Sequence, residues 1–333
     1  MSKKIKIKFQ NGINFKIATK EILSELTDEY VFVESENPDF ILFGPYGNDI
    51  PLPGNYIRIG YFCENVKPDL TICEWAFGIP REKEVHDPRY KRIQWHNLNP
   101  QCLIKPGAID LDHLFNSKTK FCNFLYGHQV PYREKFFKEL SKYKKVDAPG
   151  VSMNNMDSID DFFKGDIWER KKQFLAPYKF TIAFENYSYP GYQTEKFYHA
   201  MESNSIPIYC GDPFIGEIFN TKSFINTFDL PNPRYGSWIQ LLEKKAQPNF
   251  VDTRPQFYKS PATRISRKLK SLGREIKMNL QLNNLTYKKL VDRIVEINED
   301  KNLYKQMILE PWLKNNALPV DASLKSRWIE IFK

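Results

Sequence analysis

The sequence lacks the features that mark several common protein classes. No run of about 18 apolar residues is present, so no membrane-spanning helix is expected. The five cysteines are odd in number and never spaced as Cys-x-x-Cys, which argues against a disulfide framework or a zinc site and favours a reducing compartment. The five histidines show no metal-ligand spacing, and no nucleophile elbow, Ser-His-Asp signature or internal repeat is visible.

What the chain has in excess is positive charge. The formal net charge is +9, which suits an anionic partner such as a nucleotide diphosphate, a nucleic acid or a membrane surface, although many soluble proteins are as basic without one. The first residues, MSKKIKIKFQ, alternate Lys and Ile and predict a strand rather than a signal peptide. We therefore expect a cytoplasmic protein, with peripheral contact at the inner membrane face as the open alternative.

Short apolar strands alternate with helices in two blocks of the chain. The elements expected in the first block are strands at 4–9, 39–44, 56–62 and 70–78 and a helix at 17–26. Those expected in the second block are strands at 120–127, 179–185, 206–211 and 222–228 and a helix at 130–143. This alternation predicts an α/β fold of two domains with parallel sheets, and such sheets bind ligands outside the carboxyl ends of their strands.

A polar break near residues 115–119 separates the two blocks. We predict a first domain over 1–117 and a second domain over 118–310. A C-terminal tail over 311–333 is expected to pack back on the first domain. The second domain contains an apparent basic insertion at about 246–286, which opens with a polar, proline-rich loop.

A basic helix follows that loop and is predicted over about residues 264–280. Its apolar residues fall on one helical stripe: Ile265, Leu269, Leu272 and Ile276. Lysines and arginines fill most of the remaining positions. Such a helix can lie on an anionic membrane, so peripheral membrane contact through 264–280 is one hypothesis. The alternative is an ordinary solvated helix that packs on its own domain.

The stretch FENYSYPGYQTEKFYHA, from residue 184, joins a buried strand to a helix through a Pro-Gly turn. The helix is expected to begin at about Thr194, a good N-cap residue, and a helix N-terminus attracts phosphate. Lys196 adds a full positive charge in the first turn. Glu195 points about 100° away from Lys196, so it can meet sugar hydroxyls while Lys196 meets phosphate. The alternative is that Thr194 and Glu195 only cap the helix.

This stretch continues to IPIYCGDP and is followed by FNTKSFIN. Together they resemble the donor-site signature of the α-1,3/1,4-fucosyltransferases, glycosyltransferase family 10. The resemblance implies a GT-B fold, with two Rossmann-like domains facing across a cleft. It also implies a soluble, bacterial-type enzyme that moves L-fucose from GDP-fucose, with inversion, to a hydroxyl of N-acetylglucosamine or glucose in a glycan, most often O3.

The resemblance also implies roles for individual residues. The residues that match donor contacts of the family are Arg133, Asn186, Tyr192, Glu195 and Lys196. Arg133 lies at the start of the helix that follows strand 120–127. This helix start and the one near Thr194 come from the same sheet, so both are expected to point at the diphosphate.

A base is needed to take the proton of the attacking hydroxyl. Glu64 directly follows strand 56–62 and falls in Tyr-x-x-Glu-Asn, the segment that carries the base in bacterial members. Repulsion from the diphosphate is expected to raise the pKa of Glu64. Tyr61 would line the acceptor side, and Cys63 departs from the small residue of the relatives. The alternative for Glu64 is a solvated turn glutamate.

Other constellations point elsewhere. Asp-Leu-Asp at 110–112 matches the metal motif of other glycosyltransferases, but the cations around the expected diphosphate make a metal unnecessary, and no metal site or cofactor is predicted. The expected partners are GDP-fucose and an oligosaccharide acceptor, without nucleic acid. Two competing hypotheses are a GT-B transferase with another nucleotide-sugar donor, and a non-catalytic basic protein that binds a polyanion or a membrane surface.

Overall fold

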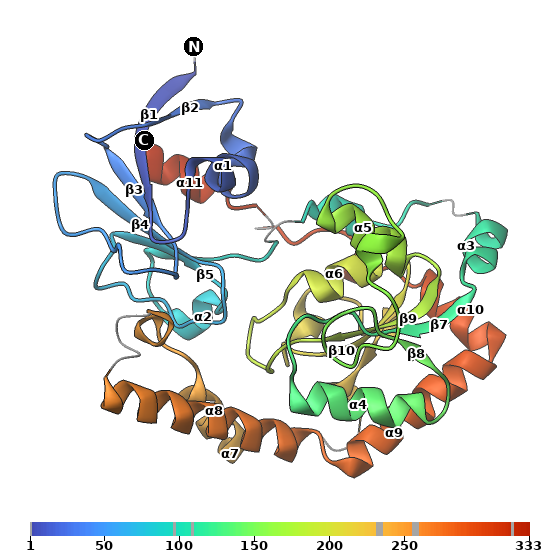
Figure 1. The fold of residues 1–333 in the computed structure, drawn as a ribbon. Coiled ribbons are helices and arrows are strands. Elements are labelled where there is room, and N and C mark those ends of the chain that lie inside the picture. The colour runs from blue at the N-terminus through green and yellow to red at the C-terminus, as the bar shows by residue number, and fades with distance from the viewer. Residues whose placement is uncertain (1, 96–97, 108–109, 231–235, 255–259, 321–322) are drawn as a thin grey trace. The chain divides into compact units, whose positions relative to one another are not determined.

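The computed structural model describes residues 2–95, 98–107, 110–230, 236–254, 260–320 and 323–333. The chain forms two compact units (Figure 1). Unit 1 comprises Met1–Asn97, Leu241–Glu275 and Val320–Lys333, and unit 2 comprises Leu98–Gln240 and Ile276–Pro319. No helix among the described residues has the length and hydropathy to cross a bilayer. The cytoplasmic location stays a prediction.

Unit 1 is built on a parallel sheet. Among the described residues its strand order is β2-β1-β3-β4-β5-β6. The strands are β1 (Lys3–Gln10), β2 (Tyr30–Glu34), β3 (Phe40–Phe43), β4 (Ile57–Phe62), β5 (Trp75–Gly78) and β6 (Tyr90–Arg92). In β1, Ile5 and Ile7 are buried and Lys4 and Lys6 are exposed, because alternate side chains of a strand point to opposite faces. The predicted first strand is therefore confirmed.

The helix predicted at 17–26 is wrong as one regular element. The structure has a short α1 (Phe15–Ile17), a π-helical turn (Ala18–Ile22) and a 3₁₀ turn (Ser24–Leu26). The Thr19 hydroxyl donates to the Phe15 carbonyl at 2.8 Å, a back-bond that tends to bend helices. The segment is also rich in β-branched residues, which lower helix propensity.

The rest of unit 1 combines one more N-terminal helix with segments from the C-terminal half of the chain. It includes α2 (Glu82–Val85), most of α7 (Ser237–Ala246), a 3₁₀ turn (Phe250–Thr253), the first part of α8 (Pro261–Gln281) and α11 (Lys325–Phe332). In α11, Trp328 stacks on Phe77 of β5 with ring centroids 4.2 Å apart. Phe332 meets Phe40 of β3 at 4.9 Å. The last helix therefore completes the aromatic core of unit 1.

Unit 2 contains a second parallel sheet of order β11-β10-β9-β7-β8 in the described residues. Its strands are β7 (Lys120–Asn123), β8 (Val146–Asp147), β9 (Tyr178–Phe184), β10 (Ile206–Cys210) and β11 (Ile225–Asn226). Its helices are α3 (Leu111–Ser117), α4 (Pro131–Ser141), α5 (Ile167–Leu175), α6 (Glu195–Glu202), α9 (Asn284–Glu299) and α10 (Lys301–Leu309). β9 and β10 are buried almost throughout, as expected for central parallel strands.

The strand order of unit 2 defines where a ligand would bind. In chain order the strands are arranged 2-1-3-4-5, with the first strand, β7, beside the third, β9. The connections after these two strands therefore leave in opposite directions, and the crevice between them is the ligand site of doubly wound sheets. The loop from 185 to 194, which follows β9, borders this switch point.

The unit boundaries differ from the predicted domains at three places, one of which is residues 311–319 of the predicted tail, which belong to unit 2 while 320–333 belong to unit 1. Residues 98–117, predicted in the first domain, belong to unit 2, where the Lys105 ammonium donates to the Glu310 carbonyl at 2.5 Å. Residues 241–275, predicted in the second domain, belong to unit 1, where the Lys67 amide donates to the Pro248 carbonyl at 2.9 Å. These last two assignments depend on contacts distant in sequence, which local composition does not reveal.

The predicted basic helix is present as α8, but its apolar stripe does not face its own unit. Ile265, Leu269 and Leu272 are 59%, 63% and 53% exposed. α8 does pack on its own unit, through contacts such as Lys270 with Asp252 and Arg274 with the Ala246 carbonyl, but this packing does not bury the stripe. Residues 255–259, in the loop predicted before α8, lie outside the described residues.

Candidate functional site

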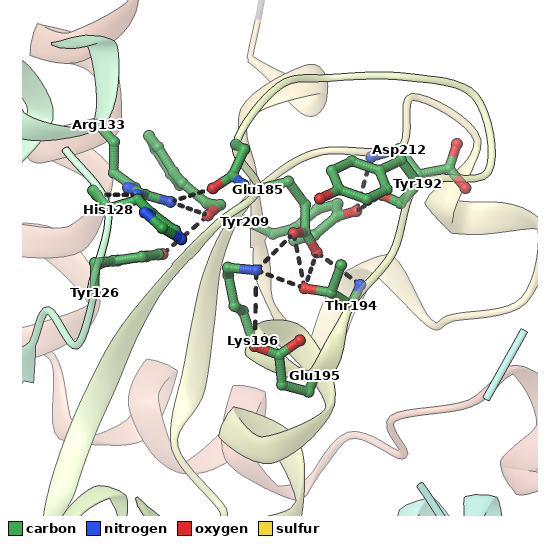
Figure 2. Close-up of polar contacts among 12 residues, drawn as sticks. Tyr126, His128, Arg133, Glu185, Tyr192, Thr194, Glu195, Lys196, Tyr209 and Asp212 are labelled. Carbon is green, nitrogen blue, oxygen red and sulfur yellow. Dashed lines mark hydrogen bonds and ion pairs between the residues drawn. The ribbon is translucent and has the colours of Figure 1, made fainter. Parts of the chain in front are cut away.

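A buried carboxylate organises the polar cluster at the switch point of unit 2 (Figure 2). Glu185 directly follows β9 and is fully buried. Its Oε1 accepts from the Thr194 amide at 2.8 Å, and its Oε2 accepts from the Thr194 hydroxyl at 2.8 Å and from Lys196 Nζ at 3.3 Å. Burial, as the dominant effect, raises the pKa of Glu185. The carboxylate thus joins the end of β9 to the start of α6.

These bonds change the role of Thr194. It occupies the N-cap position of α6, but its hydroxyl is committed to Glu185, and no side chain of the described residues caps the helix. The first-turn amides of α6 therefore keep the polarity that attracts an anion. The expectation that Thr194 only caps the helix is wrong.

Lys196 lies between two carboxylates. Its Nζ donates to the Thr194 hydroxyl at 2.9 Å and lies 3.7 Å from Glu195 Oε1 (Figure 2). Burial by itself would lower the pKa of Lys196, but Glu185 and Glu195 outweigh burial and raise it. The lysine therefore stays charged in a nearly dry site, as binding to a phosphate requires.

Glu195 is shared between Lys196 and Lys171. Lys171 lies on α5, and its Nζ is 3.6 Å from Glu195 Oε1. Burial tends to raise the pKa of Glu195, but the two lysines reverse this effect and lower it, so the carboxylate is ionised. The side chain is 29% exposed, which leaves it accessible to a ligand. An ionised, half-buried carboxylate is a suitable acceptor for sugar hydroxyls.

Arg133 forms the second part of the cluster. It lies in the first turn of α4, is fully buried, and its guanidinium stacks on the Tyr126 ring at 3.6 Å. Its Nη2 donates to the His128 carbonyl at 2.7 Å, and its Nη1 donates to Asn186 Oδ1 at 3.1 Å. Because the Asn186 oxygen accepts from Arg133, the amide NH₂ is the side of Asn186 oriented toward other partners.

The end of the β9–α6 loop is fixed from β10. Tyr209 donates its hydroxyl to the Tyr192 carbonyl at 3.3 Å, and the Asp212 amide donates to the same hydroxyl at 2.7 Å (Figure 2). Gln193 donates to Asp212 Oδ2 at 2.6 Å. Tyr192 is only 4% exposed, so in this structure its ring is part of the loop packing. The loop is thus held at both ends by buried polar contacts.

The middle of the loop is held by α8. Lys277 is 1% exposed, donates its Nζ to the Ser188 carbonyl and lies 4.4 Å from the centre of the Tyr189 ring. A buried ammonium over an aromatic face is a strong contact, because both groups are desolvated. Lys277 therefore positions the segment between Asn186 and Tyr192.

Lys277→Met is expected to loosen this loop without removing a group that a ligand touches. The affinity for GDP should fall by about tenfold, since a hydrogen bond from a charged group contributes about 1.5–3 kcal/mol. Lys277→Arg should recover most of it. Calorimetry with GDP on the three proteins makes the comparison, and equal affinities would rule out positioning by Lys277.

His199 on α6 is held neutral. It is 3% exposed, and its Nδ1 has no hydrogen-bond partner among the described residues. Burial, followed by the charge of Lys171, lowers the pKa of His199 below its usual value, with Glu195 opposing and Lys172 and Lys196 reinforcing this. A protonated imidazole would need two acceptors here, so the ring is a packed element against Trp168, 5.3 Å away.

This depressed pKa predicts acid sensitivity. Below the unfolded-state pKa, about 6.5, the unfolded chain binds a proton at His199 that the folded chain does not, so stability falls as pH decreases. The loss should approach about 1.4 kcal/mol per pH unit between pH 6.5 and 5. His199→Gln, followed by urea unfolding across this range, should flatten the dependence. Parallel curves for the two proteins would contradict the assignment.

Glu64 lies in unit 1, two residues beyond the end of β4, and is partly buried. The loop that holds it is fixed on both sides. Gln247 donates to Asn65 Oδ1 at 3.4 Å, and Phe62 packs on Phe250 with ring centroids 5.2 Å apart. The two readings of Glu64, general base and solvated turn glutamate, both stay predictions. Burial, followed by the charge of Glu64, raises the pKa of the neighbouring Cys63 thiol to about 12, so this thiol stays protonated.

Tyr61 does not match its predicted place. It is 2% exposed, and its ring packs beside Phe77, whose other neighbour is Trp328 of α11. Side chains along a strand point alternately to the two faces of the sheet, and α11 covers the face on which Tyr61 lies. The prediction that Tyr61 lines an acceptor surface is thus not supported by the structure, which makes Tyr61 a core residue.

The chemistry of the cluster follows from its charges. Three cationic side chains, Arg133, Lys171 and Lys196, accompany two carboxylates, Glu185 and Glu195. The start of α6 adds its own positive polarity. An anion such as a diphosphate fits the cations, and hydroxyl groups fit the exposed oxygen of Glu195.

Two family models match the chain. Residues 115–248 match "Glycosyltransferase family 10 (fucosyltransferase) C-term", and residues 7–99 match "Alpha-(1,3)-fucosyltransferase FucT N-terminal domain". The chain belongs to glycosyltransferase family 10. The first of these matches contains the whole cluster around Glu185, and the second contains Glu64. The predicted family is therefore confirmed, over two long segments rather than one short motif.

Curated relatives of this family 10 chain are also fucosyltransferases by name. It is 35% identical over 246 residues to alpha-(1,3)-fucosyltransferase FucT of Helicobacter pylori, across 62% of this chain and 49% of that protein. It is 36% identical over 119 residues to alpha-(1,3)-fucosyltransferase B of Drosophila melanogaster, across 34% of this chain and 26% of that protein. The chain thus spans about half the length of one relative and about a quarter of the other.

Solved structures support the fold of this family 10 chain. A crystal structure of alpha1,3-fucosyltransferase with GDP has a TM-score of 0.64 and 20% identity, over 99% of this chain and 89% of that one. A second, with GDP-fucose, has a TM-score of 0.62 and 20% identity, over 100% and 90%. The predicted fold class, GT-B with two Rossmann-like domains, is confirmed.

The structure brings most of the predicted donor residues together. Arg133 contacts Asn186, and Lys196 contacts Glu195, at one end of one sheet. Their roles toward a donor stay predictions. The sequence reasoning gave no role to Glu185, Lys171 or Lys277. The position of Glu185, an acidic residue at the end of a buried strand, could have indicated a functional role. Lys171 and Lys277 lie on helices whose sequences give no indication of contact with this loop.

The Asp-Leu-Asp segment has a local structural role. Asp110 is the N-cap of α3, and its Oδ1 accepts from the His113 amide at 3.0 Å. In the parts of the chain that the structure describes, no group of three His, Cys, Asp or Glu side chains is arranged to hold a metal ion. Independence from metal stays a prediction.

Proposed function

We propose that this chain is a fucosyltransferase that moves L-fucose from GDP-fucose to a hydroxyl of a glycan. The observation that carries the proposal is the cluster at the switch point of unit 2, where Lys196, Glu195 and the uncapped start of α6 meet. It combines groups for a diphosphate with a group for sugar hydroxyls. The relatives named alpha-(1,3)-fucosyltransferase and the structure with GDP-fucose support the choice of donor.

Each residue of the cluster has a proposed role toward the donor. Lys196 and the amides of α6 bind the diphosphate and stabilise the charge that develops on the GDP leaving group. The Asn186 amide, oriented by Arg133, donates to the nucleotide, and Glu195 accepts from fucose hydroxyls. Tyr192 shapes the loop. Lys171 keeps Glu195 ionised and adds to the positive field. These cations offset the phosphate charge, so a metal is not required.

Glu64 is the proposed general base. A single in-line displacement inverts the anomeric centre and needs a carboxylate to take the proton of the attacking hydroxyl. Glu64 stands beyond the carboxyl end of β4, where parallel sheets bind their ligands, on a loop fixed by contacts with residues 247–250. The proposed acceptor position is O3 of N-acetylglucosamine or glucose, in line with the names of the relatives.

Product analysis tests this function. The protein is incubated with GDP-fucose and N-acetyllactosamine, with lactose as a second acceptor. An α-fucosyl product, identified by the anomeric proton coupling and by a through-bond correlation to C3, is expected. Transfer from a uridine-based sugar but not from GDP-fucose would favour the alternative of another nucleotide-sugar donor. Absence of transfer from either donor class to any glycan would overturn the proposal.

A further inference from the structure

The α8 helix, drawn in orange in Figure 1, carries an apolar stripe whose side chains are exposed to solvent. Its five aliphatic side chains are 43–63% exposed: Ile265, Leu269, Leu272, Ile276 and Leu280. Steps of three or four residues place them on one face of a helix. The helix has 21 residues and is therefore about 30 Å long. A surface helix normally turns such a stripe toward its core, so α8 is oriented the opposite way.

The opposite face of α8 fixes this orientation. Lys270 forms an ion pair with Asp252, and Arg274 donates to the Ala246 carbonyl at 2.9 Å. Farther along the helix, Lys277 donates to the Ser188 carbonyl. Turning the helix to bury its stripe would break these polar contacts and leave Asp252 buried without its cation. The stripe is thus held outward by the protein's own bonds.

The surroundings of the stripe are strongly basic. The sequence of α8 contains six lysines and arginines and a single acidic residue, Glu275. A cavity of about 470 Å³ lies beside the helix, lined among others by Arg264, Arg267 and Lys268. Such a concentration of cations raises the local positive potential and attracts an anionic surface. A partner that binds this stripe must therefore offer both an apolar surface and negative charge.

We propose that α8 lies in the plane of an anionic membrane, with its stripe among the acyl chains and with Arg264, Arg267 and Lys268 near the lipid headgroups. A helix of this length with one apolar face and a basic remainder binds such an interface through buried area and electrostatic attraction. A second copy of the chain would bring two strongly basic helices together, which is unfavourable. A nucleic acid would use the cations but leave the stripe in water.

Vesicle sedimentation tests the proposal without donor or acceptor, so its outcome is independent of the proposed transferase function. Wild-type protein is mixed with phosphatidylcholine vesicles, with or without phosphatidylglycerol, at 50 mM and 500 mM salt. The triple variant Ile265→Ser, Leu269→Ser, Leu272→Ser is compared with a matched control that replaces three exposed aliphatic residues elsewhere: Leu52→Ser, Val151→Ser and Val320→Ser. Circular dichroism establishes that all three proteins fold.

Wild type and the matched control are expected to bind only the anionic vesicles, and high salt should weaken this binding. The stripe variant should bind at least tenfold more weakly. Arg264→Glu with Lys268→Glu should also lower binding to anionic vesicles. No binding of wild type at 50 mM salt, or equal binding of the stripe variant, would overturn the proposal. A wild-type dimer in light scattering that the stripe variant dissociates would instead assign the stripe to a second copy.

Discussion

Replacing Glu64 by glutamine is expected to lower turnover by about 100-fold or more, since a positioned general base contributes roughly 10²–10⁴-fold. Glutamine keeps the shape of the side chain and its contacts with the loop after β4, so the fold should be unchanged. Because Glu64 is assigned to the acceptor proton rather than to GDP, the donor affinity should remain within about twofold of wild type. Steady-state transfer rates and calorimetric titration with GDP measure the two quantities separately.

A control variant separates the effect of losing one negative charge from the effect of losing the general base. Glu36 is exposed and pairs with Lys8 on the surface of unit 1, so Glu36→Gln removes one negative charge without touching the loop of Glu64. Its turnover should match wild type. Near-normal turnover of Glu64→Gln would remove Glu64 from the role of base. A parallel fall in GDP affinity would mean instead that the substitution disturbs the donor site.

Replacing Lys196 should have two large effects. The affinity for GDP should fall by about tenfold to a hundredfold, since a charge-assisted hydrogen bond contributes about 1.5–3 kcal/mol. The free energy of unfolding should also fall, by about 3–5 kcal/mol in the range seen when a buried ion pair loses one partner. The second effect follows from Glu185, which is fully buried and would lose the adjacent cation that offsets the cost of burying it.

A double variant separates these effects. Lys196→Met combined with Glu185→Gln removes both charges, and the glutamine amide oxygen can still accept from the Thr194 amide. This protein should recover most of the stability lost in Lys196→Met but none of the GDP affinity. Thermal unfolding and calorimetry on the wild type, the single variant and the double variant give the comparison. Full GDP affinity in the double variant would make Lys196 a structural partner of Glu185 only.

The sequence was informative where structure is local. The buried strand that ends at Phe184 and the helix that begins at Glu195 are separated by a short polar loop, so their residues had to meet at one end of the sheet. The same holds for Arg133, in the first turn of the helix after β7. The family signature added the identity of the expected donor. These parts were predictable because each follows a strand of one parallel sheet, and the carboxyl ends of such strands lie at the same edge.

The sequence was less informative where a role depends on distant contacts. Tyr61 belongs to a predicted strand, but the face it occupies is covered by α11, which begins at Lys325. Lys171 and Lys277 reach the site from helices whose positions are decided by packing. The exposure of the α8 stripe was equally hidden, because the pattern of Ile265, Leu269 and Leu272 is the same whether a helix buries its stripe or presents it outward.

The measurement that tests the central claim most directly is calorimetric titration of the wild-type protein with GDP and with UDP, in the presence of a chelator. We expect saturable binding of GDP with about one molecule per chain, much weaker binding of UDP, and no dependence on metal. The double variant Lys196→Met with Glu185→Gln should bind GDP about tenfold to a hundredfold more weakly while it stays folded. Absence of nucleotide binding by the folded wild type would contradict the donor site and with it the proposed function.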